Sequence, residues 1–158
     1  MLPEYSDLVL RRATRDDLVQ VESIIRAAFA PYLGVVSPPP APLHQSYDGL
    51  LSASRSWVVE RDSHIVGCVV CEVVADRLQI DTVAVHPDHH GHGVGRQLIA
   101  RAEQEARELG LKTVTLYTNA AMSDNLEWYP QLGYLETGRR QDQGWHRVFF
   151  TKVIESDR

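Results

Sequence analysis

The sequence predicts a single α/β domain built on a mixed sheet. Segments with a strand pattern are joined by short turns, which give antiparallel pairs, and one strand–helix–strand stretch within residues 77–118 gives a parallel pair. The chain has 158 residues, about the size of one domain. No repeat, low-complexity tract or linker divides it, so we expect residues 1–158 to form one domain.

The N-terminal part predicts a strand, a helix and a proline-rich segment. Residues 8–12 are a strand candidate, and Thr14 is placed to cap a helix whose apolar residues recur at helical spacing. That helix should end near Pro31. The sequence Ser-Pro-Pro-Pro-Ala-Pro at residues 37–42 fits neither a helix interior nor a central strand. It is either a stiff surface loop or one wall of a substrate pocket. A short helix is expected at residues 48–54.

Three strands follow. Residues 57–61 and 64–74 predict a hairpin, and residues 77–85 predict the next strand. Cys68 and Cys71 resemble a redox or zinc pair by spacing. Residues three apart on a strand point to opposite faces, so we interpret the two cysteines as separate buried thiols.

The clearest helix is predicted at residues 94–109. Its apolar residues share one face, and its charged residues should be mostly solvated. Among these charged residues are Arg101, Glu103 and Glu105.

The C-terminal part predicts a strand, a short helix and a hairpin. The strand is expected at residues 112–118 and the helix at residues 124–132, where Asp124 and Glu127 are spaced as a capping box. The last two strands are expected within residues 134–154 and form the final hairpin.

Charge and hydropathy exclude several functions. The net charge is −5, whereas nucleic-acid binding usually needs a basic face, so we expect no nucleic-acid partner. There is no run of 18 apolar residues, and the first residues do not have the pattern of a secretory signal. We therefore expect no membrane partner and a cytoplasmic location.

The most informative stretch is a glycine-rich loop between a predicted strand and the long helix. It reads His90-Gly91-His92-Gly93-Val94-Gly95. Glycines at alternate positions let the backbone approach a ligand closely, and free N–H groups at a helix N-terminus bind phosphates. The spacing fits neither the Rossmann fingerprint nor the Walker loop.

Four histidines surround this loop but do not predict a metal site. His86, His89, His90 and His92 match no zinc-ligand spacing, so they either contact an anion or are exposed. Arg96 in the first helical turn either reaches a phosphate or is a surface arginine.

Two motifs resemble those of the GNAT (Gcn5-related N-acetyltransferase) family. The glycine loop is similar to the family pattern Q/R-x-x-G-x-G/A, with His90 in place of Gln or Arg. The sequence Trp-Tyr-Pro-Gln-Leu-Gly-Tyr at residues 128–134 is similar to the family pattern F/L-Y-x-x-x-G-F/Y. The order of elements over residues 8–154 also fits. The resemblance implies the GNAT fold, with a mostly antiparallel mixed sheet, splayed fourth and fifth strands, and flanking helices.

The resemblance also implies that acetyl-CoA is bound as acyl donor, without a metal. It places the pantetheine arm against the strand at residues 83–85 and the phosphates at the glycine loop. At the family's asparagine position this chain has Met122, and Asn119 and Asn125 are the nearest substitutes. The expected cofactor-binding residues are Val83, Ala84, Val85, His90, Gly91, His92, Gly93, Val94, Gly95, Arg96, Asn119 and Asn125.

Two residues match the family's catalytic positions. Asp81 lies where many relatives carry a glutamate base, and strict alternation would place it on the same strand face as Val83 and Val85. It is either the base, acting through a water, or an Asp that only bonds a neighbouring turn. Tyr129 is either the general acid for the coenzyme A thiolate or a core tyrosine.

We therefore expect an N-acetyltransferase in which an amine attacks acetyl-CoA directly in a ternary complex. The alternative is a non-catalytic acyl-CoA-binding module or sensor. The resemblance places the acceptor near residues 29–47 and 136–146, with Tyr32, His44 and Tyr47 as lining residues. We expect a small-molecule amine; a polyamine, an aminoglycoside, an amino acid and a protein amine all stay open. Family analogy also suggests a homodimer.

Overall fold

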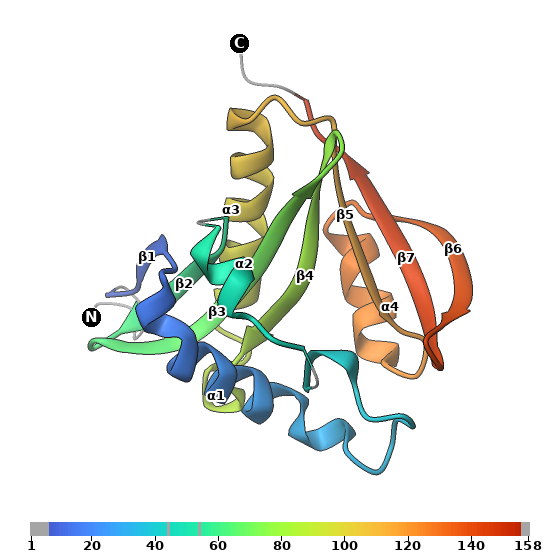
Figure 1. Ribbon diagram of the computed structural model, residues 1–158, viewed down its shortest axis with the longest axis horizontal. Coiled ribbons are helices and arrows are strands. Elements are labelled where there is room, and N and C mark those ends of the chain that lie inside the picture. The colour runs from blue at the N-terminus through green and yellow to red at the C-terminus, as the bar shows by residue number, and fades with distance from the viewer. Residues whose placement is uncertain (1–6, 44, 54, 156–158) are drawn as a thin grey trace.

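The computed structural model describes residues 7–155 except residues 44 and 54. It contains one seven-stranded sheet with strand order β1-β2-β3-β4-β5-β7-β6 (Figure 1). In chain order, its strands and α-helices are β1 (Val9–Arg12), α1 (Leu18–Phe29), α2 (Asp48–Ser52), β2 (Trp57–Arg61), β3 (His64–Val74), β4 (Arg77–Val85), α3 (Val94–Glu108), β5 (Thr113–Asn119), α4 (Ser123–Gln131), β6 (Leu135–Asp142) and β7 (Trp145–Val153).

The sheet is antiparallel except at its centre, where β4 and β5 pair in parallel. This pairing runs only from Arg77↔Thr113 to Ile80↔Leu116, although both strands continue. Beyond Ile80 the two strands part, and Figure 1 shows them diverging like the legs of an inverted V. The predicted mixed sheet with splayed fourth and fifth strands is confirmed.

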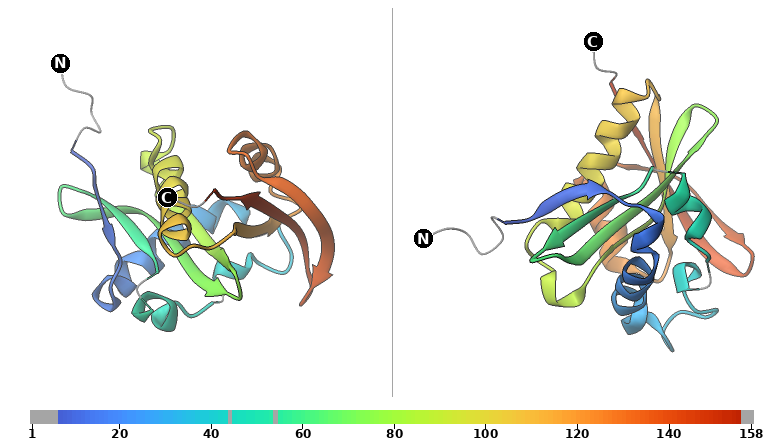
Figure 2. Two further views of the ribbon diagram at one scale, coloured as in Figure 1. Left: turned by 90° about the horizontal axis from the view of Figure 1, so that it is seen from above. Right: turned by 60° about the vertical axis from the view of Figure 1, so that its left-hand side comes forward.

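Helices cover the two faces of the sheet unequally. The helices α3 and α4 lie on one face, whereas α1 and α2 cover β3 and β4 on the other (Figure 2). In the described part of the chain, no helix covers β5, β7 and β6 on the α1 side. That half of the sheet is therefore open to a ligand.

The core divides into two clusters, one on each face of the sheet. The first cluster packs α3 and α4 against residues such as Ile80 and Cys71, and the second packs α1 and α2 against residues such as Val58 and Cys68. Both cysteines are free and buried. Because they belong to opposite clusters, the interpretation of two separate structural thiols is confirmed.

A bulge at Asp81 changes which way the residues of β4 point. In the β3–β4 register, Cys71 pairs with Ile80 and Val70 pairs with Thr82, so Asp81 has no partner on β3. Asp81 accepts a hydrogen bond from Gln79 on the α1 face, whereas Val83 and Val85 pack against the α3 cluster. The prediction that Asp81 shares a face with these valines is therefore wrong, because a bulge breaks the two-residue period.

The local predictions for helix ends have mixed outcomes. Thr14 is the N-cap of a short 3-10 turn that leads into α1, and α1 ends at Phe29 as expected near Pro31. The capping box at the start of α4 is wrong, because α4 begins at Ser123, after Met122 as N-cap, with no side-chain cap bond. In the residues that the structure describes, no helix has the length and apolar character to cross a membrane.

Candidate active site

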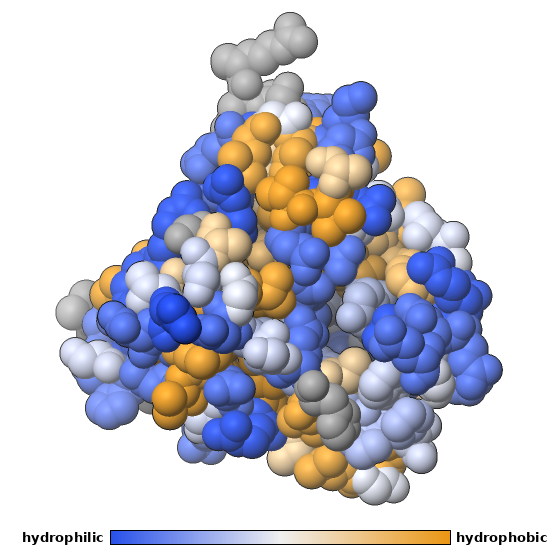
Figure 3. All heavy atoms as spheres, viewed as in Figure 1, coloured by the Kyte–Doolittle hydropathy of each residue, from blue (hydrophilic) through white to orange (hydrophobic). Residues whose placement is uncertain are grey.

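The parting of β4 and β5 opens a cavity of about 560 Å³. Its walls come from β4, the glycine loop, the start of α3, β5 and α4, and from the proline-rich segment on the α1 side. Figure 3 shows the molecule hollowed between its N-terminal half and the β6–β7 hairpin. The edge of β4 that faces this hollow has no strand partner beyond Ile80. Its main-chain groups there are available to a ligand.

The glycine loop has a shape that favours glycine. Gly91 has a φ of +82° and Gly93 a φ of +80°, in the left-handed region, and Gly93 is the N-cap of α3. A Cβ on Gly95 would lie 3.2 Å from Trp128 Cη2, so the first turn of α3 packs tightly on α4. The loop therefore ends at the N-terminus of a 15-residue helix, where free N–H groups and the helix dipole favour an anion.

Most of the sequence-predicted cofactor residues line this cavity. They are Val83, Ala84, Val85, His90, Gly91, Gly93, Val94, Gly95, Arg96, Asn119 and Asn125. His92 lies in the same loop, outside the cavity lining, and has a contact of its own.

The side chain of His90 is turned toward its own chain. Its Nε2 lies 2.9 Å from the carbonyl oxygen of Val85, which ties the loop to the end of β4. His86 Nδ1 accepts a hydrogen bond from the backbone N–H of Asp88 at 3.1 Å. These two histidines therefore shape the loop through main-chain contacts. Among the described residues, no group of three or more His, Cys, Asp or Glu side chains is arranged to hold a metal ion.

The two predicted asparagines have different local roles. Asn119 Oδ1 accepts from the backbone N–H of Ala121 at 2.9 Å and closes the turn after β5. Asn125 Nδ2 donates to Thr118 Oγ1 at 3.1 Å and holds α4 against β5. Both residues line the cavity, so both stay candidates for the cofactor contact.

Asp81 is a half-buried acid at the point where the strands part. Its Oδ1 accepts from Gln79 Nε2 at 3.0 Å, and its Oδ2 is buried without a donor among the described residues. Burial and, next to it, the neighbouring carboxyl of Glu72 together raise the pKa of Asp81 to about 7. Near neutral pH this group can accept and return a proton.

Tyr129 lies in the wall opposite, on α4. Its ring packs against Trp128, Phe150 and Tyr134 at centroid distances of 5.1, 5.7 and 6.1 Å. Burial raises the pKa of the Tyr129 hydroxyl above its ordinary value, so the hydroxyl stays protonated. It is both a core residue and a cavity-lining one.

The expected acceptor residues have three different outcomes. Tyr32 lines the cavity. His44 lies outside the described residues. The prediction for Tyr47 is wrong, because this side chain is 1% exposed and its hydroxyl bonds Thr82 and the Pro42 carbonyl, both at 3.0 Å. Tyr47 is a core residue that anchors the proline-rich segment.

Part of the proline-rich segment forms a wall of the cavity. Pro40, Ala41 and Pro42 line the cavity. Trp145 Nε1 donates to the Pro39 carbonyl at 2.8 Å and ties the segment to the β6–β7 hairpin. The segment therefore encloses the hollow from the α1 side.

Two further residues that line the cavity were missed by the sequence analysis. They are Tyr117 of β5 and Arg147 of β7. Glu72 of β3, which was also missed, lies beside Asp81. Arg147 lies one residue beyond the expected acceptor segment. The alternation of Trp145, Arg147 and Phe149 along one strand was a signal that these side chains share a face.

This arrangement defines a class of protein: an α/β domain in which the central sheet splits at a half-buried acid, and the freed strand leads to a glycine loop at a helix N-terminus. The model of the acetyltransferase (GNAT) family matches residues 21–134, and the chain belongs to this family. It is 31% identical over 98 residues, 58% of this chain, to human N-acetyltransferase 8B. It is 34% identical over 83 residues, 51% of this chain, to an amino-acid acetyltransferase of Azotobacter vinelandii. The matches cover 43% and 18% of those relatives, less than half of either.

The solved structures show the same fold. A PaiA N-acetyltransferase of Thermoplasma acidophilum, crystallised with coenzyme A, aligns with a TM-score of 0.77 at 16% identity. The alignment covers 92% of this chain and 98% of that one.

Proposed function

We propose that this protein transfers an acetyl group from acetyl-CoA to an amine by direct attack. The observation that supports this most is the unpaired edge of β4, which runs from the half-buried Asp81 to the glycine loop at the start of α3. An extended thiol arm fits such an edge as an added strand, and the pyrophosphate fits the helix N-terminus. The relatives named as acetyltransferases, and the neighbour crystallised with coenzyme A, support the same cosubstrate.

The chain's own residues supply the steps of the transfer. An alkyl amine is mostly protonated at neutral pH, and Asp81 accepts its proton, directly or through a water. The amine nitrogen then bonds to the thioester carbonyl carbon, and the C–S bond breaks with its electron pair staying on sulfur. The nitrogen releases its second proton to solvent as the amide forms. A main-chain N–H of residues 83–85 stabilises the oxyanion that forms on the carbonyl oxygen.

Tyr129 acts on the leaving thiolate. Because burial raises its pKa, the hydroxyl remains a donor throughout and stabilises the thiolate by a hydrogen bond before solvent returns the proton. A full transfer from Tyr129 would be uphill, since an ordinary thiol has a pKa of about 8.5.

Calorimetric titration of acetyl-CoA into the purified protein, followed by a thiol-release assay with amines, tests this function. Micromolar binding with thiol release supports the enzyme. Binding without release to any amine would favour the alternative, an acyl-CoA-binding module. Absence of binding to the folded protein would exclude both.

Replacing Gly93 by Val should weaken acetyl-CoA binding about 100-fold. A β-branched residue at a φ of +80° is strained, so the loop relaxes and misaligns the N–H groups that face the phosphates. Two charge-assisted hydrogen bonds at about 1.5 kcal/mol each account for that loss. The same change at Gly49, which has open space and an ordinary φ in α2, is the control. Equal affinities of the two variants would contradict the loop assignment.

Replacing Tyr129 by Phe should lower kcat at least about tenfold and leave the Kd of acetyl-CoA unchanged within about threefold. That pattern would show that the hydroxyl acts on the leaving thiolate and not on the binding of acetyl-CoA. Tyr134→Phe is the matched control. The Tyr134 hydroxyl donates to Glu103 at 2.9 Å, and Tyr134 does not line the cavity. That control should lose stability but not turnover. Unchanged kcat in Tyr129→Phe would remove Tyr129 from the mechanism.

A further inference from the structure

The cavity has an acidic wall where β4 and β5 part. Asp81 follows Ile80, the last β4 residue paired with β5, and Tyr117 follows Leu116, its partner. Paired strands lie about 4.8 Å apart, so Asp81 and Tyr117 are neighbours at the mouth of the split. The carboxyl of Glu72 lies beside Asp81 on the same face. An ammonium group would be attracted to this wall.

The same place has a basic wall on its other side. Arg147 of β7 lies with its guanidinium carbon 4.2 Å from the centre of the Tyr117 ring. Its side chain is 11% exposed, and it lines the cavity. Arg147 Nη1 donates to Asp142 Oδ2 at 2.8 Å. Within the described residues, Asp142 is its one hydrogen-bond acceptor, so Nε and Nη2 retain donors for a ligand.

The basic character continues away from Asp81. A second hollow of about 380 Å³ adjoins Arg147 on the open face of β5, β7 and β6. Its charged lining is three arginines, Arg77, Arg140 and Arg147, against one acid, Asp142. Arg140 lies over the Phe149 ring at 3.8 Å, beside Tyr117. In Figure 3, hydrophilic residues gather over this hairpin beside the hollow. A polyamine or other polycation would meet repulsion here.

We infer that the acceptor is a free α-amino acid, whose amine faces Asp81 and whose carboxylate is bound by Arg147 across Tyr117. This inference rests on the proposed function and names its substrate class. A guanidinium with two free donors matches a carboxylate better than any neutral group. In an α-amino acid the two charges are a few bonds apart, which fits two walls separated by one aromatic ring.

Binding to the protein saturated with coenzyme A tests the inference without turnover. The probes are the common L-amino acids, each compared with its own α-carboxamide, which keeps the amine and side chain but not the negative charge. At least one amino acid should bind about 100-fold more tightly than its amide. Thiol release with acetyl-CoA should show the same preference in kcat/KM.

Variants of Arg147 test whether this residue selects the carboxylate. Arg147→Gln should raise the KM of the best amino acid at least about 50-fold, while kcat/KM for its amide changes less than about threefold. Arg147→Lys should recover only part of the loss, because a lysine cannot bind a carboxylate in bidentate fashion. Arg139→Gln is the control, since Arg139 pairs with Glu136 on the exposed edge strand. If Arg147 had a purely structural role, Arg147→Gln would lower kcat/KM equally for the amino acid and for its amide.

The outcomes separate the two proposals. Amino acids that bind to the coenzyme A complex without being acetylated would overturn the proposed function and leave the carboxylate site standing. Amides or simple amines that bind as well as the amino acids would overturn the inference and leave the acetyltransferase standing. A peptide N-terminus preferred over every free amino acid would also overturn it.

Discussion

Asp81→Asn should lower kcat/KM about 100- to 1000-fold at pH 8 and at the same time stabilise the folded protein. This fall in kcat/KM is expected because asparagine has the shape of the aspartate but cannot accept a proton as a general base. Because the pKa of Asp81 is raised to about 7, the wild-type base is ionised above pH 7 and protonated below it. The rate difference between wild type and variant should therefore shrink as the pH falls through 7.

The stability gain follows from the same group. An aspartate has an ordinary pKa of 3.8, so between about pH 4 and pH 7 the folded state binds more protons than the unfolded state. The free energy of unfolding then falls as the pH rises through this window, and the full cost of the buried charge is present above pH 7. Asparagine removes that cost, and we expect about 1–3 kcal/mol of added stability at pH 8 after allowing for partial exposure.

Rate–pH profiles and urea unfolding at pH 5 and pH 8 check both effects. Glu72→Gln is the companion variant: it removes the neighbouring carboxylate, so the pKa of Asp81 should fall and the rate profile should shift to lower pH. Equal rates for Asp81→Asn and wild type at every pH would show that the base lies elsewhere. Equal stabilities at pH 8 would show that Asp81 carries no buried charge.

The parts of the site that depend on local sequence could be predicted. The glycine spacing at residues 91–95 specifies backbone shape and needs no distant partner, and the structure shows the left-handed φ values that such a loop requires. Cys68 and Cys71 could be assigned to opposite faces because that segment of β3 keeps a regular alternation.

The parts that depend on register or on a distant partner could not be predicted. The bulge at Asp81 arises from the pairing of β3 with β4 and leaves no mark in the sequence of β4 itself. Arg147 reaches the cavity because β7 pairs with β5, which brings Asn119 opposite Arg147. Tyr47 was expected at the acceptor site but is drawn into the core by two hydrogen bonds.

The helix α3 shows the same limit on its charged face. Glu103 and Glu105 were expected in solvent, yet both are buried, and so the prediction is wrong for them. Glu103 accepts from Tyr134 and from Lys152 Nζ at 2.9 and 3.0 Å. These partners come from residues far along the chain, which a helical periodicity cannot reveal.

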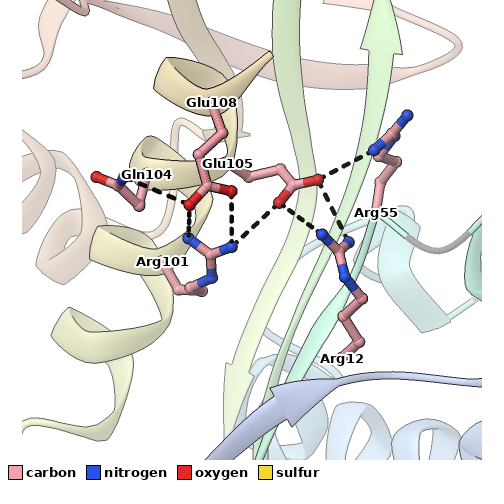
Figure 4. A network of polar contacts seen from close by, with 6 residues as sticks. All are labelled: Arg12, Arg55, Arg101, Gln104, Glu105 and Glu108. Carbon is pink, nitrogen blue, oxygen red and sulfur yellow. Dashed lines mark hydrogen bonds and ion pairs between the residues drawn. The ribbon is translucent and has the colours of Figure 1, made fainter. Parts of the chain in front are cut away.

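Glu105 is the centre of a second long-range network, shown in Figure 4. Its side chain is 2% exposed, and its two oxygens accept from Arg12, Arg55 and Arg101 at 3.1 to 3.3 Å. Arg12 and Arg101 also stack on Trp57, at 4.6 and 3.9 Å from the ring centre. One buried carboxylate on α3 is therefore bonded by guanidinium groups from β1, from the segment just before β2 and from α3 itself.

Glu105→Gln should lower the free energy of unfolding by about 3 kcal/mol and the Tm by roughly 6–12 °C. The amide keeps the size of the side chain but leaves three arginines around a neutral group in a desolvated place. Glu108→Gln is the matched control, because Glu108 bonds the same Arg101 but is 48% exposed, and its loss should cost much less stability because solvent screens an exposed ion pair. Chemical unfolding of both variants measures the difference, with acetyl-CoA affinity as a check that the cavity is intact. If the two substitutions lower the free energy of unfolding equally, the buried carboxylate does not join the N-terminal part of the sheet to α3. The arginines would then be held by stacking on Trp57 and by hydration.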